Sequence, residues 1–139
     1  MTLSTPAWRR HGQLQLGSSG YWVIEAKSGA IAKVIHKRDA NQLSGSMNWF
    51  RERYDTTARG LPVIVHPART TARDATAAPG TRVLDADGLD RLRSAARAFA
   101  AALASTEWNT AEHVNDLLAG HHLRGGELNQ YLKDVRSSR

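Results

Sequence analysis

The chain has 139 residues, 41% of them apolar and 23% charged, a balance that fits one compact globular domain and excludes a disordered chain. Nineteen Lys and Arg residues against thirteen Asp and Glu give a net charge of +6, and this excess favours a polyanionic partner such as nucleic acid. There is no cysteine, which excludes disulfides and cysteine-based zinc sites, and no long apolar run or leader pattern, which predicts a cytoplasmic protein without a membrane partner.

The positive charge is concentrated in the N-terminal part of the chain. Residues 1–59 hold nine Lys and Arg residues and four Asp and Glu residues, so this part carries +5 of the net charge. A polyanion is therefore expected to meet the N-terminal half. A solvated basic surface explains the same charge equally well.

The first half of the chain predicts a β-hairpin, an amphipathic helix and a buried strand. Alternating polar and apolar residues and an aromatic, β-branched run flank the turn Gly17–Gly20. Apolar residues then recur at helical spacing, and a short apolar run lies between Gly60 and Pro67. The predicted ranges are 13–16 and 21–27 for the hairpin strands, 39–54 for the helix and 61–66 for the buried strand.

The second half predicts one more strand and three helices. The Ala/Thr/Arg-rich segment 67–80 is expected to be a loop, long enough to be functional or mobile. A strand at 82–84 precedes a helix that Asp87 would cap. Two short helices are expected at 110–119 and 127–135. The fold class is therefore α/β (α+β), a mixed sheet flanked by helices.

One predicted strand carries the residues that could bind a metal ion or take part in catalysis. Alternation places Glu25 and Lys27 on the same strand face, and we expect both to project into an open cleft. A carboxylate can hold Mg²⁺ or Mn²⁺, and the carbonyl of Ala26 would add a second ligand. A neighbouring lysine can orient a metal-bound water or stabilise charge on a scissile phosphate. An ordinary ion pair on a half-exposed strand is the alternative.

The segment WVIEAKSG resembles the third-strand motif of the PD-(D/E)xK nuclease superfamily, which has the restriction-endonuclease-like fold. The longer GSSGYWVIEAKSG is similar to its nuclease-related and restriction-type members. The resemblance implies that Glu25 and Lys27 are the catalytic E-x-K pair and that Gln42 supports them from the following helix. It also implies a DNA substrate and Mg²⁺ (or Mn²⁺) as cofactor. It covers roughly residues 13–104.

The second acid of that motif is missing. A four-residue turn at Gly17–Gly20 would place Gly12 opposite Glu25, and a shift by one residue would offer His11 or Gln13. No acid precedes Glu25, and the opening helix and first strand of the fold have no counterpart. Either the chain is a nuclease domain truncated at its N-terminus, or it is a short protein that has lost activity. In both cases catalysis is expected to be impaired.

Three basic residues lie between the E-x-K strand and the helix. Lys33, Lys37 and Arg38 would contact nucleic-acid phosphates, or else form a solvated connector. No nucleotide cofactor is expected, because the chain has neither a GxGxxG nor a Walker A motif, and the histidines suggest no metal site.

Two functions follow from this reading. The first is a Mg²⁺-dependent DNA nuclease-like domain, with a core at 1–104 that is incomplete at its N-terminal end and a C-terminal helical extension at 105–139. The alternative is a non-catalytic module that keeps the fold and binds nucleic acid or another protein, with homo-oligomers left open. A third possibility is an unrelated α/β protein whose E-x-K tripeptide is accidental.

Overall fold

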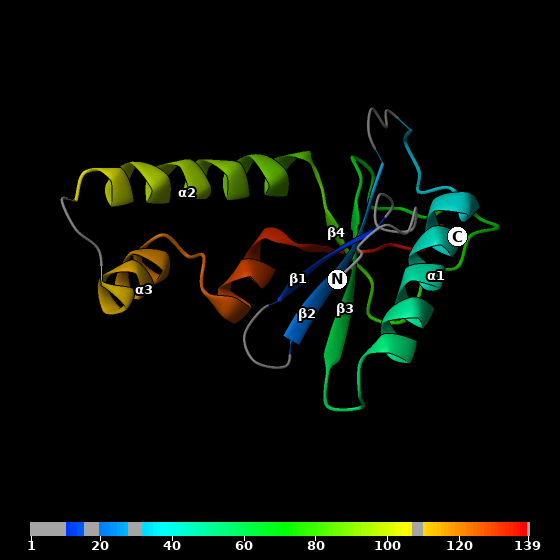
Figure 1. The fold of residues 1–139 in the computed structure, drawn as a ribbon. Coiled ribbons are helices and arrows are strands. Elements are labelled where there is room, and N and C mark those ends of the chain that lie inside the picture. Colours follow the sequence, from blue (N-terminus) through cyan, green and yellow to red (C-terminus); the bar gives the residue numbers. More distant parts are fainter. Residues whose placement is uncertain (1–10, 16–19, 28–31, 107–109, 139) are drawn as a thin grey trace.

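The computed structural model describes residues 11–15, 20–27, 32–106 and 110–138, and a five-stranded mixed sheet forms its centre (Figure 1). The strands lie side by side in chain order, and the three central strands are parallel to one another. The first and last strands run antiparallel to their neighbours. The strands are β1 (His11–Gln15), β2 (Gly20–Ala26), β3 (Arg59–Val65), β4 (Arg82–Leu84) and β5 (Lys133–Asp134). The α/β class with a mixed sheet is thus confirmed.

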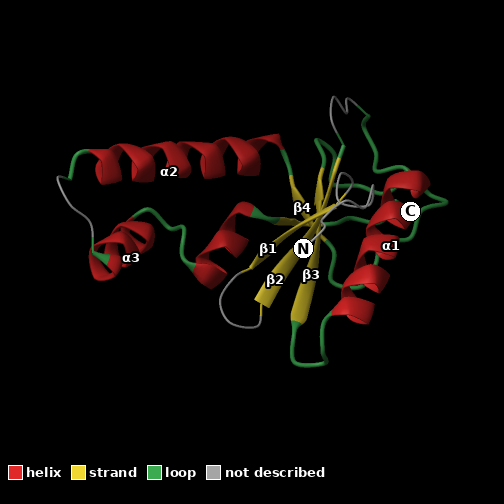
Figure 2. Cartoon of the chain, viewed as in Figure 1, coloured by secondary structure: helices red, strands yellow, loops and turns green. Residues whose placement is uncertain are grey.

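Helices lie on both sides of this sheet (Figure 2). The helix α1 (Lys37–Arg53) connects the parallel strands β2 and β3, and such a connection must cross one face of the sheet. The start of α2 (Ala86–Ala104) and the 3₁₀ helix η2 (Gly125–Tyr131) cover the other face. The last helix, α3 (Ala111–Gly120), packs against α2. No helix in the described part of the chain is long and apolar enough to cross a membrane.

Two apolar layers hold the helices to the sheet. On the α1 face, Val23 of β2 packs with Met47 and Phe50. On the other face, Trp22 packs with Leu84, Leu128 and related core residues, and its indole N–H donates to Asn129 Oδ1 at 2.9 Å. Side chains of β2 thus alternate between the two layers, as the sequence predicted.

The hairpin is present, but its register differs from the predicted one. Glu25 lies opposite His11, and Gly12 lies opposite Ile24. The connection between the paired residues Gln15 and Tyr21 spans five residues instead of four, and this shifts the pairing by one position. Part of the turn, residues 16–19, lies outside the described residues. The corrected position opposite Glu25 still carries no carboxylate.

The loop between β3 and β4 is tied to the rest of the molecule. Ile35, in the connector before α1, donates to Thr70 O at 2.7 Å, and its carbonyl accepts from Ala72 N–H at 2.9 Å. The C-terminal segment holds the loop from the other side, because Arg136 N–H donates to Arg69 O at 2.8 Å. These backbone bonds fix the loop in place.

Two sequence-based expectations for the C-terminal half are wrong. Asp85, not Asp87, caps α2, because its side chain accepts from Gly88 N–H at 2.9 Å. The segment predicted as a helix at 127–135 forms η2 followed by β5. Because β5 pairs with β4 and Leu128, Tyr131 and Leu132 lie in the core, the sheet and its core extend beyond residue 104.

Candidate functional site

Lys27 and Asp39 meet at the carboxyl end of the parallel strands. Lys27 directly follows β2, and Asp39 lies in the first turn of α1. Their Nζ and Oδ1 atoms are 3.3 Å apart, and 47% of the lysine side chain but only 4% of the aspartate side chain is exposed. A half-exposed ammonium group therefore compensates a buried carboxylate. The sequence predicted Lys27 as a site residue and missed its partner.

Glu25, two residues before Lys27, lies on the same face of β2, underneath α1. It is only 7% exposed, and the Ser46 hydroxyl of α1 donates to its Oε2 at 3.3 Å. The open cleft shared by Glu25 and Lys27 is therefore a wrong expectation. The physical reason is that α1 crosses the sheet face from which both side chains project, and it covers the side chain of Glu25.

The other residues that the resemblance implied lie nearby without joining Glu25. Gln42 is half-buried on α1, and its backbone carbonyl lies 3.1 Å from Ser46 Oγ, so the single hydroxyl proton of Ser46 is shared between this oxygen and Glu25 Oε2. Among the described contacts, its side chain makes no hydrogen bond to Glu25 or Lys27. Ala26, whose carbonyl was the second expected metal ligand, is an exposed residue at the end of β2.

His66 is the residue that sequence reasoning missed at this end of the sheet. It directly follows β3 and is 2% exposed, and it interacts electrostatically with Lys27, His36 and Asp39. Burial lowers its pKa below the ordinary value of 6.5, and the nearby Asp39 carboxylate only partly offsets this effect. The ring is therefore neutral at pH 7. The sequence did contain a signal for His66. This residue comes at the end of a predicted buried strand, and the carboxyl ends of neighbouring parallel strands lie at the same edge of a sheet.

The three basic residues of the connector and first helical turn are exposed. Lys33 precedes α1, whereas Lys37 and Arg38 are its first two residues. None of the three forms an ion pair with another residue of the described structure. They lie at the end of α1 that carries the Lys27–Asp39 pair, so their charges add to that of Lys27.

The donor set at this end of the sheet does not complete a magnesium site. Glu25 and Asp39 bring two carboxylates, but Glu25 is bonded to Ser46 and Asp39 to Lys27. In the described ranges, no group of three or more His, Cys, Asp or Glu side chains is placed to hold a metal ion. Mg²⁺ requires a nearly regular octahedron of oxygen ligands. The described residues therefore supply two carboxylates at this end of the sheet but not a complete ligand set for the ion that the resemblance implies.

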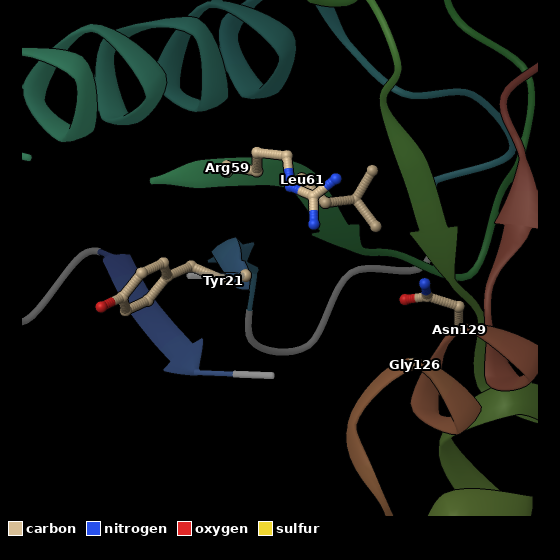
Figure 3. Close-up of a pocket in the computed structure, with 7 residues that line it drawn as sticks. Tyr21, Arg59, Leu61, Gly126 and Asn129 are labelled. Atoms are coloured by element: carbon tan, nitrogen blue, oxygen red, sulfur yellow. The ribbon is translucent and has the colours of Figure 1, made fainter. Parts of the chain in front are cut away.

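A cavity opens at the opposite end of the same strands (Figure 3). It has a volume of about 410 Å³ and lies where β2 and β3 begin, between Tyr21 and Arg59 on one side and Asn129 on the other. Asn129 already accepts the hydrogen bond from Trp22, so its Oδ1 atom is engaged. None of the predicted site residues lines this cavity.

Comparison of the chain with protein-family models, with curated proteins and with solved structures finds no match.

Proposed function

We propose that this chain is a DNA-binding domain that contacts the phosphate backbone with the carboxyl end of its sheet. The supporting observation is the contact between Lys27 and Asp39, because it brings the E-x-K strand and the basic start of α1 to one place. Lys27, Lys33, Lys37 and Arg38 are all exposed, and they lie at or near the end of β2 and the start of α1. Four such cations suit a polyanion better than an isolated anionic group.

The position of Lys37 and Arg38 gives this proposal a further physical argument. The amino end of a helix carries partial positive charge, so cations in the first turn are unfavourable there, by about 0.3–1 kcal/mol each. His36, the N-cap residue, makes no side-chain hydrogen bond that would satisfy the helix start. A phosphate bound at this helix start would offset the repulsion.

Hydrolysis of the bound phosphodiester is the second candidate function. Glu25 and Lys27 share one strand face, as the resemblance to PD-(D/E)xK nucleases implies, and Asp39 supplies a second acid beside Lys27. The motif expects this second acid on the preceding strand, where His11 stands opposite Glu25. Because both carboxylates already have partners, hydrolysis is expected to be weak and to depend on added Mg²⁺ or Mn²⁺.

A plasmid assay with the full chain tests both candidates. Supercoiled plasmid is incubated with the wild type, with Lys27→Ala and with Lys27→Ala/Asp39→Asn, in Mg²⁺, Mn²⁺ or EDTA. We expect the wild type to retard the plasmid under all conditions and to nick it slowly only with metal. In both variants, the affinity for DNA is expected to fall by at most about tenfold, because one phosphate contact of several is lost. Both variants are also expected to lose nicking.

The double variant is the matched control for folding. Removing Lys27 alone leaves the buried Asp39 carboxylate without its cation, a loss of about 1–3 kcal/mol, whereas Asp39→Asn removes that buried charge as well. Equal nicking by wild type and Lys27→Ala would show that this site does not hydrolyse DNA. Absence of any retardation of the plasmid by the wild type would refute the DNA-binding proposal itself.

A further inference from the structure

The cavity of about 410 Å³ at the amino ends of β2 and β3 lies where one strand carries no side chain. In the register of these strands, Gly20 lies beside Arg59 and Trp22 lies beside Leu61. Paired residues of parallel strands project to the same face, and Trp22 and Leu61 both belong to the core layer under η2. Gly20 and Arg59 therefore face η2 as well, and the missing side chain of Gly20 leaves a hollow next to Arg59.

Arg59 brings an accessible positive charge to this cavity. It is exposed, and its guanidinium group forms no hydrogen bond or ion pair with another described residue. Among the described residues that line the cavity it is the only charged one, so no acid in this wall opposes it. Its side chain extends toward the cavity, whereas the ring of Tyr21 turns away and packs on Phe50 and Tyr54 (Figure 3). A guanidinium group binds carboxylate and phosphate oxygens with two parallel N–H donors.

Asn129 presents a second donor from the opposite wall (Figure 3). The indole N–H of Trp22 can only donate, so the amide oxygen of Asn129, 2.9 Å away, must be the atom that faces it. This bond fixes the orientation of the amide and leaves both hydrogens of Nδ2 without a partner among the described residues. Asn129 is half-buried, so its amide group is accessible from the cavity. The wall formed by η2 therefore offers a donor, and its acceptor is already used.

The rest of the wall leaves room for a ligand. Leu61 is half-buried and supplies an apolar surface between the two donors. A Cβ atom at Gly126 would meet nothing within 4 Å, so the η2 wall is open at this position. Pockets for small molecules have volumes of about 300–1,000 Å³ and combine apolar surface with a few polar groups. With a donor on each side, the cavity suits a molecule that has acceptor oxygens at two places and a negative charge.

We propose that this cavity binds a small oxygen-rich anion, whose carboxylate or phosphate group accepts from Arg59 and whose second oxygen accepts from Asn129 Nδ2. The site lies at the opposite end of β2 and β3 from Lys27 and Asp39. It is therefore separate from the surface proposed for DNA, and either proposal can fail without the other.

Nuclear magnetic resonance of two side chains in the full chain tests the proposal. The signals are the Nε–H group of Arg59 and the Nδ2 hydrogens of Asn129. The probes are glucuronate, glucose 6-phosphate and glucose, which share a sugar ring and carry a carboxylate, a phosphate and no charge. We expect glucuronate, glucose 6-phosphate or both to shift the two signals saturably, with a dissociation constant of about 1 mM or below. The tighter of the two identifies the oxyanion. No saturable shift with either, or an equal shift with glucose, would overturn the proposal.

Arginine variants assign the binding to the guanidinium group. We expect Arg59→Gln to weaken the tighter probe about tenfold, the effect of one charge-assisted hydrogen bond. The matched control Arg97→Gln removes an exposed charge from α2, outside the cavity, and should bind like the wild type. Equal affinities of Arg59→Gln and the wild type would contradict the proposal. A DNA duplex that shifts both signals when neither sugar anion does would assign them to DNA and also refute it.

Glycine variants assign the binding to the cavity itself. Gly126→Leu adds a side chain to the cavity wall at a position where a Cβ atom meets no neighbour, so we expect the fold to persist and the tighter probe to bind at least about tenfold more weakly. The matched control Gly45→Leu adds the same side chain at an equally open position on α1 and should keep the wild-type affinity. If Gly126→Leu does not fold, Arg59→Gln decides alone.

Discussion

At the scale of single residues, buried polar groups gather at one end of the sheet. Glu25, Asp39, Ser46 and His66 are all less than 9% exposed, and each comes from an element that starts or ends there. Such groups lower stability unless they are paired. Glu25 has Ser46 and Asp39 has Lys27, but the Nε2 atom of His66 has no partner in the described structure. His66 is therefore the residue at which stability and pH are expected to be linked.

Acid is expected to destabilise the fold through His66. Its pKa is lowered by burial, against an opposing effect of Asp39, so the unfolded chain binds this proton more readily than the folded one. The stabilising contribution is complete above the unfolded pKa of about 6.5 and is lost as the pH falls through the lower folded value. Urea unfolding at pH 7.5, 6.5 and 5.5 measures it. The groups that surround the ring are Lys27, His36 and Asp39.

The variant His66→Gln separates this effect from other titrations. It keeps a side-chain donor but cannot gain a proton, so its stability should fall less between pH 7.5 and 5.5 than that of the wild type. The remaining histidines and acids titrate in both proteins and cancel in the comparison. Parallel losses in the two proteins would mean that His66 contributes nothing to the pH dependence.

At the scale of elements, two helical glycines should respond in opposite directions to the same substitution. A Cβ atom at Gly88 would lie 2.2 Å from the backbone oxygen of Tyr131, so Gly88→Ala must push η2 away from α2. We expect a loss of about 1–3 kcal/mol or more. Gly45, in the middle of α1, has nothing within 4 Å of that position, and Gly45→Ala should add about 0.5–1 kcal/mol. Urea midpoints measure both, and equal effects would contradict the packing of η2 on α2.

The elements themselves follow closely from sequence patterns. The helix predicted at 39–54 is α1 (Lys37–Arg53), and the strand predicted at 61–66 is β3 (Arg59–Val65), because a long apolar stripe and a Gly-bounded apolar run are strong signals. The pairing of Lys133 and Asp134 as β5 could not be predicted. Two residues show no periodicity, and their strand exists only because β4 offers a free edge.

The site was predictable only in part for a similar reason. Alternation correctly placed Glu25 and Lys27 on one face of β2, because that property is local. The neighbouring residues Asp39 and His66 come from other parts of the chain. Predicting that they lie near Lys27 requires knowing how α1 crosses from β2 to β3. A helix that follows a parallel strand begins near its carboxyl end, so the first turn of α1 was bound to meet Lys27. Applied to the sequence, that rule would have indicated Asp39.

At the scale of the whole molecule, the charge is distributed unevenly over the two sides of the sheet. The helices α2 and α3 extend away from the sheet on the side opposite α1 (Figure 1). Two of the three arginines on α2 are paired within the helix, Arg91 with Asp87 at 3.2 Å and Arg93 with Asp90 at 3.6 Å. The exposed cations at the start of α1 have no such pairing in the described chain. A polyanion should therefore prefer the α1 end.

The salt dependence of DNA binding is the quantitative form of this expectation. Each phosphate contact releases condensed counterions, so the logarithm of the binding constant falls with the logarithm of salt concentration by about 0.9 per contact. The triple variant Lys33→Ala/Lys37→Ala/Arg38→Ala should therefore reduce the slope by about 3, and its binding should be weakest relative to wild type at low salt. Fluorescence anisotropy of a labelled duplex between about 50 and 200 mM salt measures both quantities.

A second triple variant provides the matched control for net charge. Arg93→Ala/Arg97→Ala/Arg124→Ala removes the same three charges from exposed positions on α2 and just before η2. If the contact is local to the start of α1, this variant keeps the wild-type slope, because distant charges are screened beyond about 10 Å. If both variants lower the slope equally, DNA responds to the overall charge of +6 instead of a defined surface. A slope near zero in the wild type would mean that phosphates are not what this end of the sheet binds.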